Sequence, residues 1–327
     1  MEHPNYNSTS VPNSNQTTSM VSYKPVGITV LLGLCCLVGW AGNIAVINMI
    51  SRQWNQRLSF TVKLMLNLAI SDFLVLALAP VVAYSLLYGW TFGIWACRIL
   101  KYLIYSAMYA SVLTVTMMAV HHYYTVRTLV PYRHQLERLQ KNRRCVLLIG
   151  LWSLALLFAL PILFTQDVQF KRGSPRCQRT VKSVSGKVTA LLFEVMLGFV
   201  LPFSTILVSY CWINMTKLQK GQTAEKRKRR MRMLVISIVT AFFIFWTPVH
   251  IINVIDVVTI LTQSSFPDVY ARLKSFRTVT GDLTKTVAVI NCCVNPFLYA
   301  FASGLITKRR EQKEKETSTN ITLTNVS

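Results

Sequence analysis

The sequence predicts an all-α membrane protein, a bundle of seven transmembrane helices with an extracellular amino terminus and a cytoplasmic carboxyl terminus. The 327-residue chain is 52% hydrophobic and only 14% charged, and its mean hydropathy of +0.40 is too high for an ordinary soluble protein. Seven apolar runs are each long enough to cross a bilayer core, which takes about 20 helical residues. Basic residues gather beside the ends of these runs, as they do in the cytoplasmic loops of membrane proteins.

Each predicted helix is one apolar run with few charges. The run at 26–50 has no charged residue, and each of the others carries at most two. The helices are expected near residues 26–50, 64–87, 99–122, 145–164, 188–214, 231–261 and 278–302. They form a transmembrane domain over residues 25–304, between an extracellular tail at 1–24 and a cytoplasmic tail at 305–327. The chain is therefore expected to be a multi-pass protein of the plasma membrane.

The distribution of charge sets the expected orientation. With 35 Lys and Arg against 12 Asp and Glu, the chain has a formal net charge of +23. The connections at 127–144 and 217–232 are rich in basic residues, which places them in the cytoplasm. The amino tail is then outside, and its two Asn-x-Ser/Thr glycosylation sequons, at Asn7 and Asn15, agree with that side. Because these charges sit between apolar runs, they indicate membrane orientation and not binding to nucleic acid.

Cys97 and Cys177 are predicted to form a disulfide. Five of the eight cysteines lie inside apolar runs, where a thiol acts as a small buried hydrophobe, and Cys145 lies at the reducing cytoplasmic edge. The remaining two lie on the oxidising outer side, at the start of the third helix and in the loop after the fourth. Their bridge would hold that loop across the mouth of the bundle.

Short motifs along the helices resemble those of the rhodopsin-like (class A) G-protein-coupled receptors, in the same order and with the same spacing. They are Gly42-Asn43, Asn67-Leu68-Ala69-x-x-Asp72, Trp152, Pro202 with Tyr210, Phe242-x-x-x-Trp246-x-Pro248, and Asn295-Pro296-x-x-Tyr299. The resemblance covers nearly the whole chain. It implies that the chain is a receptor and not an enzyme. Such a receptor engages a heterotrimeric G protein of the inhibitory type, arrestin, receptor kinases and the surrounding membrane lipids.

Within that family, three helical segments are most similar to the leukotriene B4 receptors of the chemoattractant group. They are residues 64–69, 108–113 and 193–203. The resemblance implies an extracellular anionic lipid ligand with a carboxylate, hydroxyls and a long apolar tail. It implies no cofactor other than a sodium ion that would act as an allosteric ligand. Peptide and chemokine receptors share parts of these segments, so a peptide or chemokine ligand is the alternative.

The outer loop at 164–187 supports an anionic ligand by its charge. It carries six basic residues against Asp167, on the side of the membrane where the positive-inside rule does not explain them. A cationic mouth above an apolar shaft suits an anionic lipid; a solvated or glycan-contacting loop is the alternative. The side chains expected to line the ligand site are Lys101, Tyr105, Met108, Glu194, Trp246, His250, Asn253 and Lys285. Gln166 stands where leukotriene receptors carry an Arg, which counts against a lipid ligand.

Asp72 is a candidate site because an ionisable side chain in mid-membrane is costly and usually functional. If the helices pack as in the resembling family, Ser111, Asn291 and Asn295 face it. The four side chains would then form an oxygen-rich pocket suited to a sodium ion, and no other metal is expected. The alternative is an interhelical hydrogen-bond network without an ion.

The resemblance also implies a set of activation-switch residues. They are His121, His122, Tyr123, Tyr210, Phe242, Trp246, Pro248 and Tyr299. Pro248 removes a backbone hydrogen bond and supplies a hinge in the sixth helix. At 121–123, His-His-Tyr replaces the family's Asp-Arg-Tyr, and an imidazole does not replace a permanently charged guanidinium. Weak G-protein turnover, as in a scavenging receptor, is therefore expected, with ordinary signalling as the alternative.

A transporter or channel is the rival class, because seven helices with an intramembrane Asp also suit ion movement. That class predicts inverted repeats and paired broken helices, which the sequence does not show. His121 and His122 do not indicate a metal site, because adjacent helical residues point about 100° apart and two ligands alone do not complete a site.

Overall fold

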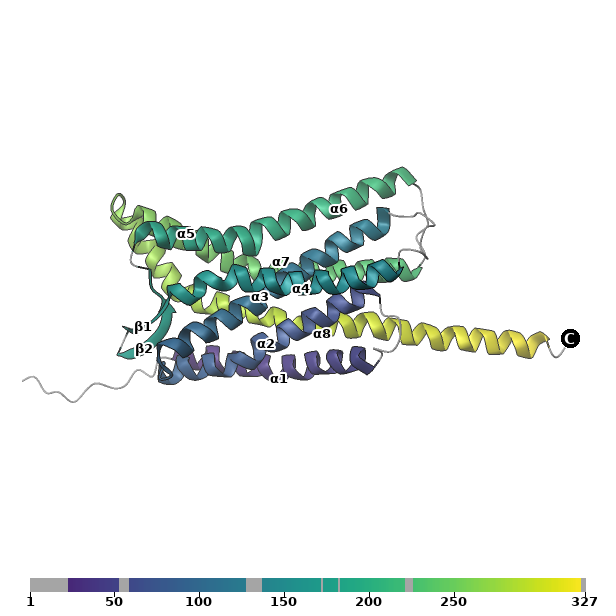
Figure 1. The fold of residues 1–327 in the computed structure, drawn as a ribbon. Coiled ribbons are helices and arrows are strands. Elements are labelled where there is room, and N and C mark those ends of the chain that lie inside the picture. The colour runs from purple at the N-terminus through teal and green to yellow at the C-terminus, as the bar shows by residue number, and fades with distance from the viewer. Residues whose placement is uncertain are drawn as a thin grey trace, which may run out of the picture.

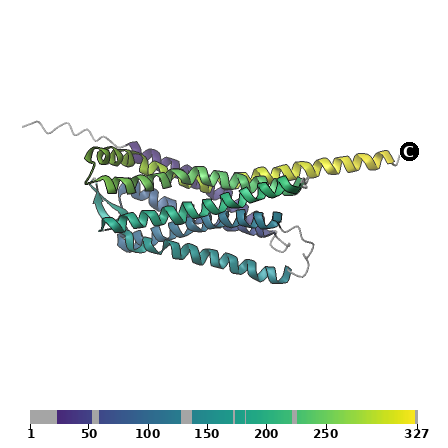
Figure 2. The same ribbon diagram turned by 90° about the horizontal axis from the view of Figure 1, so that it is seen from above.

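The computed structural model describes residues 23–52, 59–127, 137–171, 173–181, 183–220 and 226–324. The predicted glycosylation sites Asn7 and Asn15, with most of the amino tail, lie outside these residues. In the described part of the chain, long helices run side by side along one axis, and a two-stranded hairpin covers one end of the bundle (Figures 1 and 2).

The helices follow the predicted order. The elements are α1 (Tyr23–Arg52), α2 (Phe60–Tyr88), α3 (Gly93–Arg127), α4 (Glu137–Thr165), β1 (Gln166–Lys171), β2 (Ser174–Arg179), α5 (Val184–Val195), η1 (Met196–Val200), α6 (Leu201–Lys220), α7 (Lys226–Thr262) and α8 (Pro267–Thr324). Because α5, η1 and α6 follow one another without a gap, they form a single helix. The described residues therefore make seven long helices.

Six of these helices are long and apolar enough to cross a membrane, within the part of the chain that the structure describes. They span Val26–Arg52, Phe60–Tyr88, Gly93–Thr125, Cys145–Thr165, Val184–Trp212 and Met233–Thr262. The seventh is α8, which packs against α1, α2 and α7. Polar residues such as Lys285, Asn291 and Asn295 lower its hydropathy. The predicted seven-helix bundle is confirmed.

Several helices extend beyond the predicted apolar runs. The fourth begins at Glu137 instead of 145, the fifth ends at Lys220 instead of 214, and α8 spans Pro267–Thr324 instead of 278–302. Hydropathy marks the limits of the bilayer core, whereas a helix continues outside it for as long as its backbone hydrogen bonds remain favourable. The segment before 278 and most of the predicted tail at 305–327 are therefore helical.

The all-helical prediction omitted the β-hairpin that follows α4. Its strands β1 and β2 pair antiparallel, with Val168 opposite Cys177. Gly173 in the turn has a φ of 76°, a conformation that glycine adopts without strain. The backbone N–H of Trp90 donates to the carbonyl of Pro175 at 2.8 Å, which fastens the hairpin to the end of α2. Hydropathy did not reveal the strands because both are short and largely polar.

Helices α1 and α8 approach closely at Gly42. A Cβ atom built on this glycine would lie 2.8 Å from Cβ and 2.9 Å from Cγ of Pro296. The next residue, Asn43, is buried and donates from Nδ2 to the carbonyl oxygens of Gly39 and Cys292, both at 2.9 Å. The Gly42-Asn43 pair therefore sets the spacing between the first and last helices, because one residue removes bulk and the other supplies a bond.

Asn67 links three helices through its side chain. Trp152 Nε1 of α4 donates to Asn67 Oδ1 at 2.8 Å, and Asn67 Nδ2 donates to Thr114 Oγ1 of α3 at 2.7 Å. Polar side chains inside a bilayer find their partners on neighbouring helices, because lipid offers none. These bonds hold α2, α3 and α4 in register below the hairpin.

The fifth membrane helix contains one wide turn, η1. The N–H of Leu201 donates to the carbonyl of Met196, five residues back instead of four, and the next residue, Pro202, has no N–H to donate. The turn places Gly198 against α7, where an added Cβ would lie 3.1 Å from Cε1 of His250. This close approach brings α7 against the fifth helix at the level of the predicted ligand site.

Candidate ligand site and intramembrane polar cluster

The hairpin is fixed over the bundle by the predicted disulfide. Cys97, in the second turn of α3, is bonded to Cys177 of β2, and their Cα atoms are 5.6 Å apart. Trp90 and Leu100 are buried beside the bridge, and Val168 of β1 packs against them. The hairpin is therefore a fixed cover over the outer ends of α2 and α3.

Arg176 of the hairpin stabilises the end of α2. Its Nη1 donates to the carbonyl oxygens of Ser85 at 2.9 Å and Leu86 at 3.1 Å, and its Nε donates to Ser174 Oγ at 3.1 Å. A cation at the last carbonyls of a helix is favourable because they form the negative end of the helix dipole. This member of the basic loop thus has a structural partner, which the loop's charge count alone did not indicate.

Arg179 of the same strand forms an ion pair with Glu194 of α5. Glu194 is only 7% exposed, and its other oxygen, Oε2, accepts a bond from Asn253 Nδ2 of α7 at 3.3 Å. The structure therefore joins β2, α5 and α7 at one buried carboxylate. Glu194 and Asn253 were predicted as site residues, but Arg179 was recognised only as one of the loop's charges.

Four aromatic rings pack together on the side of α7 that carries Asn253, deeper in the bundle. Trp246 stacks on Phe242 with ring centroids 5.3 Å apart, and His250 stacks on Trp246 at 5.8 Å. His250 also contacts Phe199 at 5.0 Å. Both ring nitrogens of His250 and Nε1 of Trp246 are buried and have no hydrogen-bond partner among the described residues. Trp246 and His250, both predicted to line the ligand site, therefore lie in contact with each other and have polar atoms without partners.

The other predicted ligand residues lie on α3 and α8. Tyr105 packs beside Tyr109, at a ring-centroid distance of 6.5 Å, and Met108 packs against the central core. Lys101 is half-buried and Lys285 is exposed. Tyr105 and Met108 therefore line the interior of the bundle on the α3 side.

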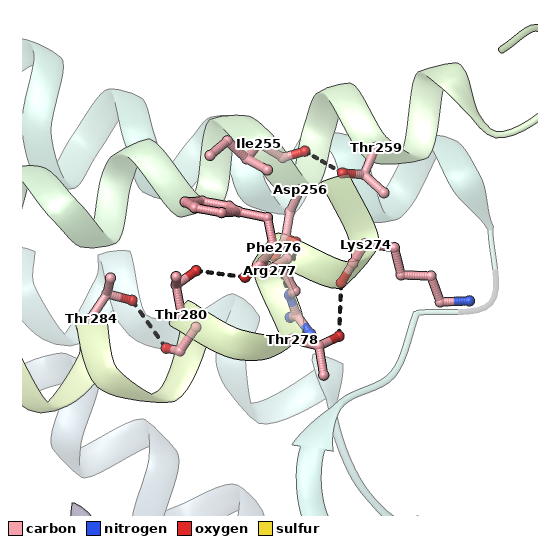
Figure 3. Close-up of polar contacts among 10 residues, drawn as sticks. Ile255, Asp256, Thr259, Lys274, Phe276, Arg277, Thr278, Thr280 and Thr284 are labelled. Carbon is pink, nitrogen blue, oxygen red and sulfur yellow. Dashed lines mark hydrogen bonds and ion pairs between the residues drawn. The ribbon is translucent and has the colours of Figure 1, made fainter. Parts of the chain in front are cut away.

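The outer ends of α7 and α8 are joined by an ion pair that sequence analysis missed. Arg277 Nε lies 2.8 Å from Oδ1 and 3.2 Å from Oδ2 of Asp256, and Figure 3 shows the two residues where α7 and α8 lie side by side. Nearby on α8, the hydroxyls of Thr278 and Thr280 donate to the carbonyl oxygens of Lys274 and Phe276 in their own helix. Asp256 lies three residues beyond Asn253, so the pair forms the rim above the Glu194 cluster.

Asp72 lies at the centre of a buried polar cluster. Asn295 Nδ2 of α8 donates to its Oδ2 at 2.7 Å, and Ser111 Oγ of α3 donates to its Oδ1 at 3.1 Å. Ser111 Oγ also lies 2.9 Å from Ser71 Oγ. Two of the other three predicted members therefore bond to Asp72, and Asp72 is fully buried.

The donor set of this cluster fits a sodium ion. Asn291 and Asn295 are almost fully buried, and the Oδ1 atom of each has no hydrogen-bond partner in the described part of the chain. Hard cations take oxygen ligands, and carboxylate and amide oxygens are both suitable. No group of three His, Cys, Asp or Glu side chains that could hold a metal occurs among the described residues. The unpaired oxygens of this cluster are therefore of the kind that a hard cation takes as ligands.

The predicted switch residues lie at two levels. Phe242, Trp246 and Tyr299 are buried in the central core, and the hydroxyls of Tyr210 and Tyr299 have no hydrogen-bond partner among the described residues. His121 lies lower on α3 and packs edge-on against Phe60 of α2, with ring centroids 5.0 Å apart. The side chains of His122 and Tyr123 are half-buried. The first His of the His-His-Tyr triplet is therefore directed towards α2.

The described helices form a seven-helix bundle with a hairpin over one end and a buried Asp at its centre, which is the architecture of a transmembrane receptor. The chain matches the family model for the 7 transmembrane receptor (rhodopsin family) over residues 42–299, which is well over half of its length. The chain belongs to the rhodopsin family of seven-transmembrane receptors. It is therefore a multi-pass plasma-membrane receptor and not an enzyme, and membership implies coupling to a G protein and an extracellular ligand.

Individual relatives agree with the predicted resemblance to leukotriene receptors. The chain is 34% identical to human leukotriene B4 receptor 1 over 299 residues, which cover 88% of this chain and 82% of that protein. It is 27% identical to mouse cysteinyl leukotriene receptor 1 over 323 residues, or 94% and 90% of the two chains. It is also 30% identical to G-protein coupled receptor E1 of equine herpesvirus 2 (strain 86/87) over 273 residues, or 82% and 68%.

Proposed function

We propose that this receptor binds an anionic lipid chemoattractant of the leukotriene B4 type at the outer cluster. The observation that carries the proposal is Arg179, which is held at the border between the hairpin and the bundle by Glu194. Similarity to the human leukotriene B4 receptor supports the same ligand class. A leukotriene has one carboxylate, hydroxyl groups and a long apolar tail, and each part has a counterpart here.

The carboxylate binds Arg179. Only Nη2 of this guanidinium donates to Glu194, while Nε is buried and has no hydrogen-bond partner in the described residues. A buried donor without an acceptor costs about 1–3 kcal/mol, and a guanidinium binds carboxylates through two parallel bonds. An incoming carboxylate therefore satisfies an existing donor without first breaking the ion pair.

The hydroxyls and the tail fit the layer below. Glu194 and the two nitrogens of His250 are within this layer, and the nitrogens have no partner among the described residues. The rings of Phe199 and Trp246 supply apolar surface around them. An apolar cavity with a small number of polar groups is typical of a lipid-binding site.

A binding experiment tests the ligand class. Arg179→Gln is expected to weaken binding of labelled leukotriene B4 by roughly tenfold to a hundredfold, which corresponds to the loss of one charge-assisted hydrogen bond, while binding of the methyl ester changes little. Lys187→Gln is the matched control, because it removes an exposed charge near the same loop. Equal losses for acid and ester would contradict a carboxylate contact. Activation by formylated peptides or chemokines, without leukotriene B4 binding, would favour the peptide alternative.

Ligand binding is coupled to the cytoplasm through α7. Trp246, His250 and Asn253 are all on this helix, and Pro248 lies between them. A ligand that fits one position of α7 better than another shifts a pre-existing equilibrium, and the inner half of α7 moves outward about Pro248. The opened side then receives a G protein of the inhibitory type, and receptor kinases and arrestin follow. The partners are identified by measuring agonist-stimulated nucleotide exchange on a panel of Gα subtypes, with arrestin recruitment measured in parallel. Exchange confined to non-inhibitory subtypes would contradict the assignment to an inhibitory G protein.

A poorly coupled, scavenging receptor is the second candidate. It is favoured by His121, which packs on Phe60 and whose Nδ1 lies 3.5 Å from Thr61 Oγ1 of α2. Neither His at 121–122 supplies a permanent cation for the G protein. His121→Asp combined with His122→Arg is expected to raise agonist-stimulated exchange, with little change in ligand affinity. Strong exchange by the unmodified receptor, with no gain in the double variant, would exclude the scavenging function.

Sodium is proposed as an allosteric ligand of the Asp72 cluster. The fit of the unpaired Oδ1 atoms of Asn291 and Asn295 supports it. In the test, agonist affinity is measured in sodium and in choline chloride, and Asp72→Asn is expected to remove the difference. If the unmodified receptor shows no sodium effect, the cluster is an interhelical hydrogen-bond network.

A further inference from the structure

Three exposed cationic side chains lie on one side of α8, near its outer end. Lys274, Arg277 and Lys285 are separated by three and eight residues, spacings that keep them on one side of a helix with 3.6 residues per turn. The same spacing leads on to Ala288 and Cys292, which are buried. The cations are therefore on the outward continuation of the packed face of α8.

The contacts of Arg277 confirm the direction of this face. Arg277 reaches Asp256 of α7, and Figure 3 shows Lys274 one turn earlier on α8. The Nζ atom of Lys274 lies 5.1 Å from the ring centroid of Tyr270. Between Arg277 and Lys285, Gly281 leaves room, because a Cβ built on it would meet no atom within 4 Å. Helix α8 is thus charged at its outer end, and there is room for a side chain beside the buried Gly281 below it.

This row of cations leads towards the candidate ligand site. Asp256 is three residues from Asn253, which donates to Glu194. At a rise of about 1.5 Å per residue, Lys274 and Arg277 are about 4.5 Å apart along the helix, and Arg277 and Lys285 about 12 Å apart. The first interval is shorter than the screening length of about 8 Å at physiological ionic strength, and the second is about one and a half times as long. An anion midway between Arg277 and Lys285 is about 6 Å along the helix from each of them, which is within this length.

We propose that Lys274, Arg277 and Lys285 form an entry track that guides the carboxylate of the ligand from the outer solution to the site. The inference rests on the proposed anionic ligand. Charges of this kind act mainly on the association rate, because they raise the local concentration of the ligand without holding it in the final complex. Asp256 is the regulating member of the track, since its carboxylate neutralises Arg277 and competes with the ligand for it.

The track is tested by the kinetics of labelled leukotriene B4 binding to the full-length receptor in nanodiscs. One charge at about 8 Å in water changes an encounter rate by roughly twofold to threefold, so Lys274→Gln combined with Arg277→Gln is expected to slow association by about fourfold to ninefold. The dissociation rate stays unchanged, the effect shrinks at high salt, and the methyl ester shows none. Asp256→Asn is expected to speed association by about twofold.

Arg272→Gln is the matched control. Arg272 is an exposed residue of the same helix, but its position is five residues before Arg277, which places it on the opposite side of α8. It is expected to leave association unchanged. Equal slowing by Arg272→Gln would show a general basic field and overturn the track, and so would a change confined to dissociation. If the unmodified receptor does not bind leukotriene B4 at all, the proposed function fails first, and the track fails with it.

Discussion

Replacing Gly42 by Ala tests whether the close approach of α1 and α8 holds the bundle together. The new Cβ would lie 2.8 and 2.9 Å from two ring carbons of Pro296, whereas carbon atoms in contact are about 3.5–4.0 Å apart. The helices must therefore separate by roughly 0.6–1.2 Å, because the proline ring is rigid. The bond from Asn43 Nδ2 to the Cys292 carbonyl, now 2.9 Å, would lengthen beyond the range of a hydrogen bond.

The expected change in the free energy of unfolding follows from three contributions. Overpacking costs about 1–3 kcal/mol, the lost interhelical bond costs about 0.6 kcal/mol, and the better helix propensity of Ala returns about 1 kcal/mol. Gly42→Ala is therefore expected to destabilise the receptor by roughly 0.5–2.5 kcal/mol.

Gly33→Ala in the same helix is the control. A Cβ built on Gly33 would meet no atom within 4 Å, so this change gains helix propensity without overpacking. Thermal unfolding of both variants in nanodiscs, followed by the reaction of buried cysteines with a fluorogenic thiol reagent, measures the contrast. If Gly42→Ala is as stable as Gly33→Ala, the close approach does not limit the packing and the reasoning is refuted.

Three other changes have defined outcomes. Cys97→Ala and Cys177→Ala should each lower stability by about 2–4 kcal/mol and abolish surface expression, and the double variant should be no worse than either single one; additive losses in a surface-labelling assay would contradict the bridge. Arg176→Gln should lower the free energy of unfolding by about 1–2 kcal/mol through the loss of the cap on α2, whereas an unchanged melting temperature would show that solvent replaces it. Gly198→Ala should displace His250 by a few tenths of an ångström and weaken agonist binding several-fold with little effect on melting, and an unchanged affinity would remove His250 from the site.

The helices and the disulfide could be predicted because their signals are local. A run such as 26–50 is apolar along its whole length, and a bilayer accepts such a run only as a helix. Cys97 and Cys177 were identified by the compartment in which their segments lie, and the structure forms this bridge. Asp72 was recognised because a carboxyl group is costly in lipid wherever its partners come from.

The partners of the polar side chains could not be predicted in the same way. Arg176 and Arg179 are three residues apart in one basic loop, yet one caps α2 and the other pairs with Glu194 of α5. Alternation of side chains along a strand, and the register that the hairpin adopts, decide which element each arginine meets. The polar strands gave no hydropathy signal, so this difference was invisible in the sequence.

The outer end of α8 shows the same limit. The apolar run predicts that the seventh helix begins at 278, whereas α8 begins at Pro267. The three added turns carry Lys274 and Arg277, and Arg277 pairs with Asp256 of α7. By itself, the sequence determined the number and order of the helices, the bridge over the outer mouth and the family, because each depends on the residue types within a short segment. Only the tertiary structure decided that Arg277 meets Asp256 and that Arg179 meets Glu194, because an ion pair depends on the positions of two helices or strands that their own sequences do not specify.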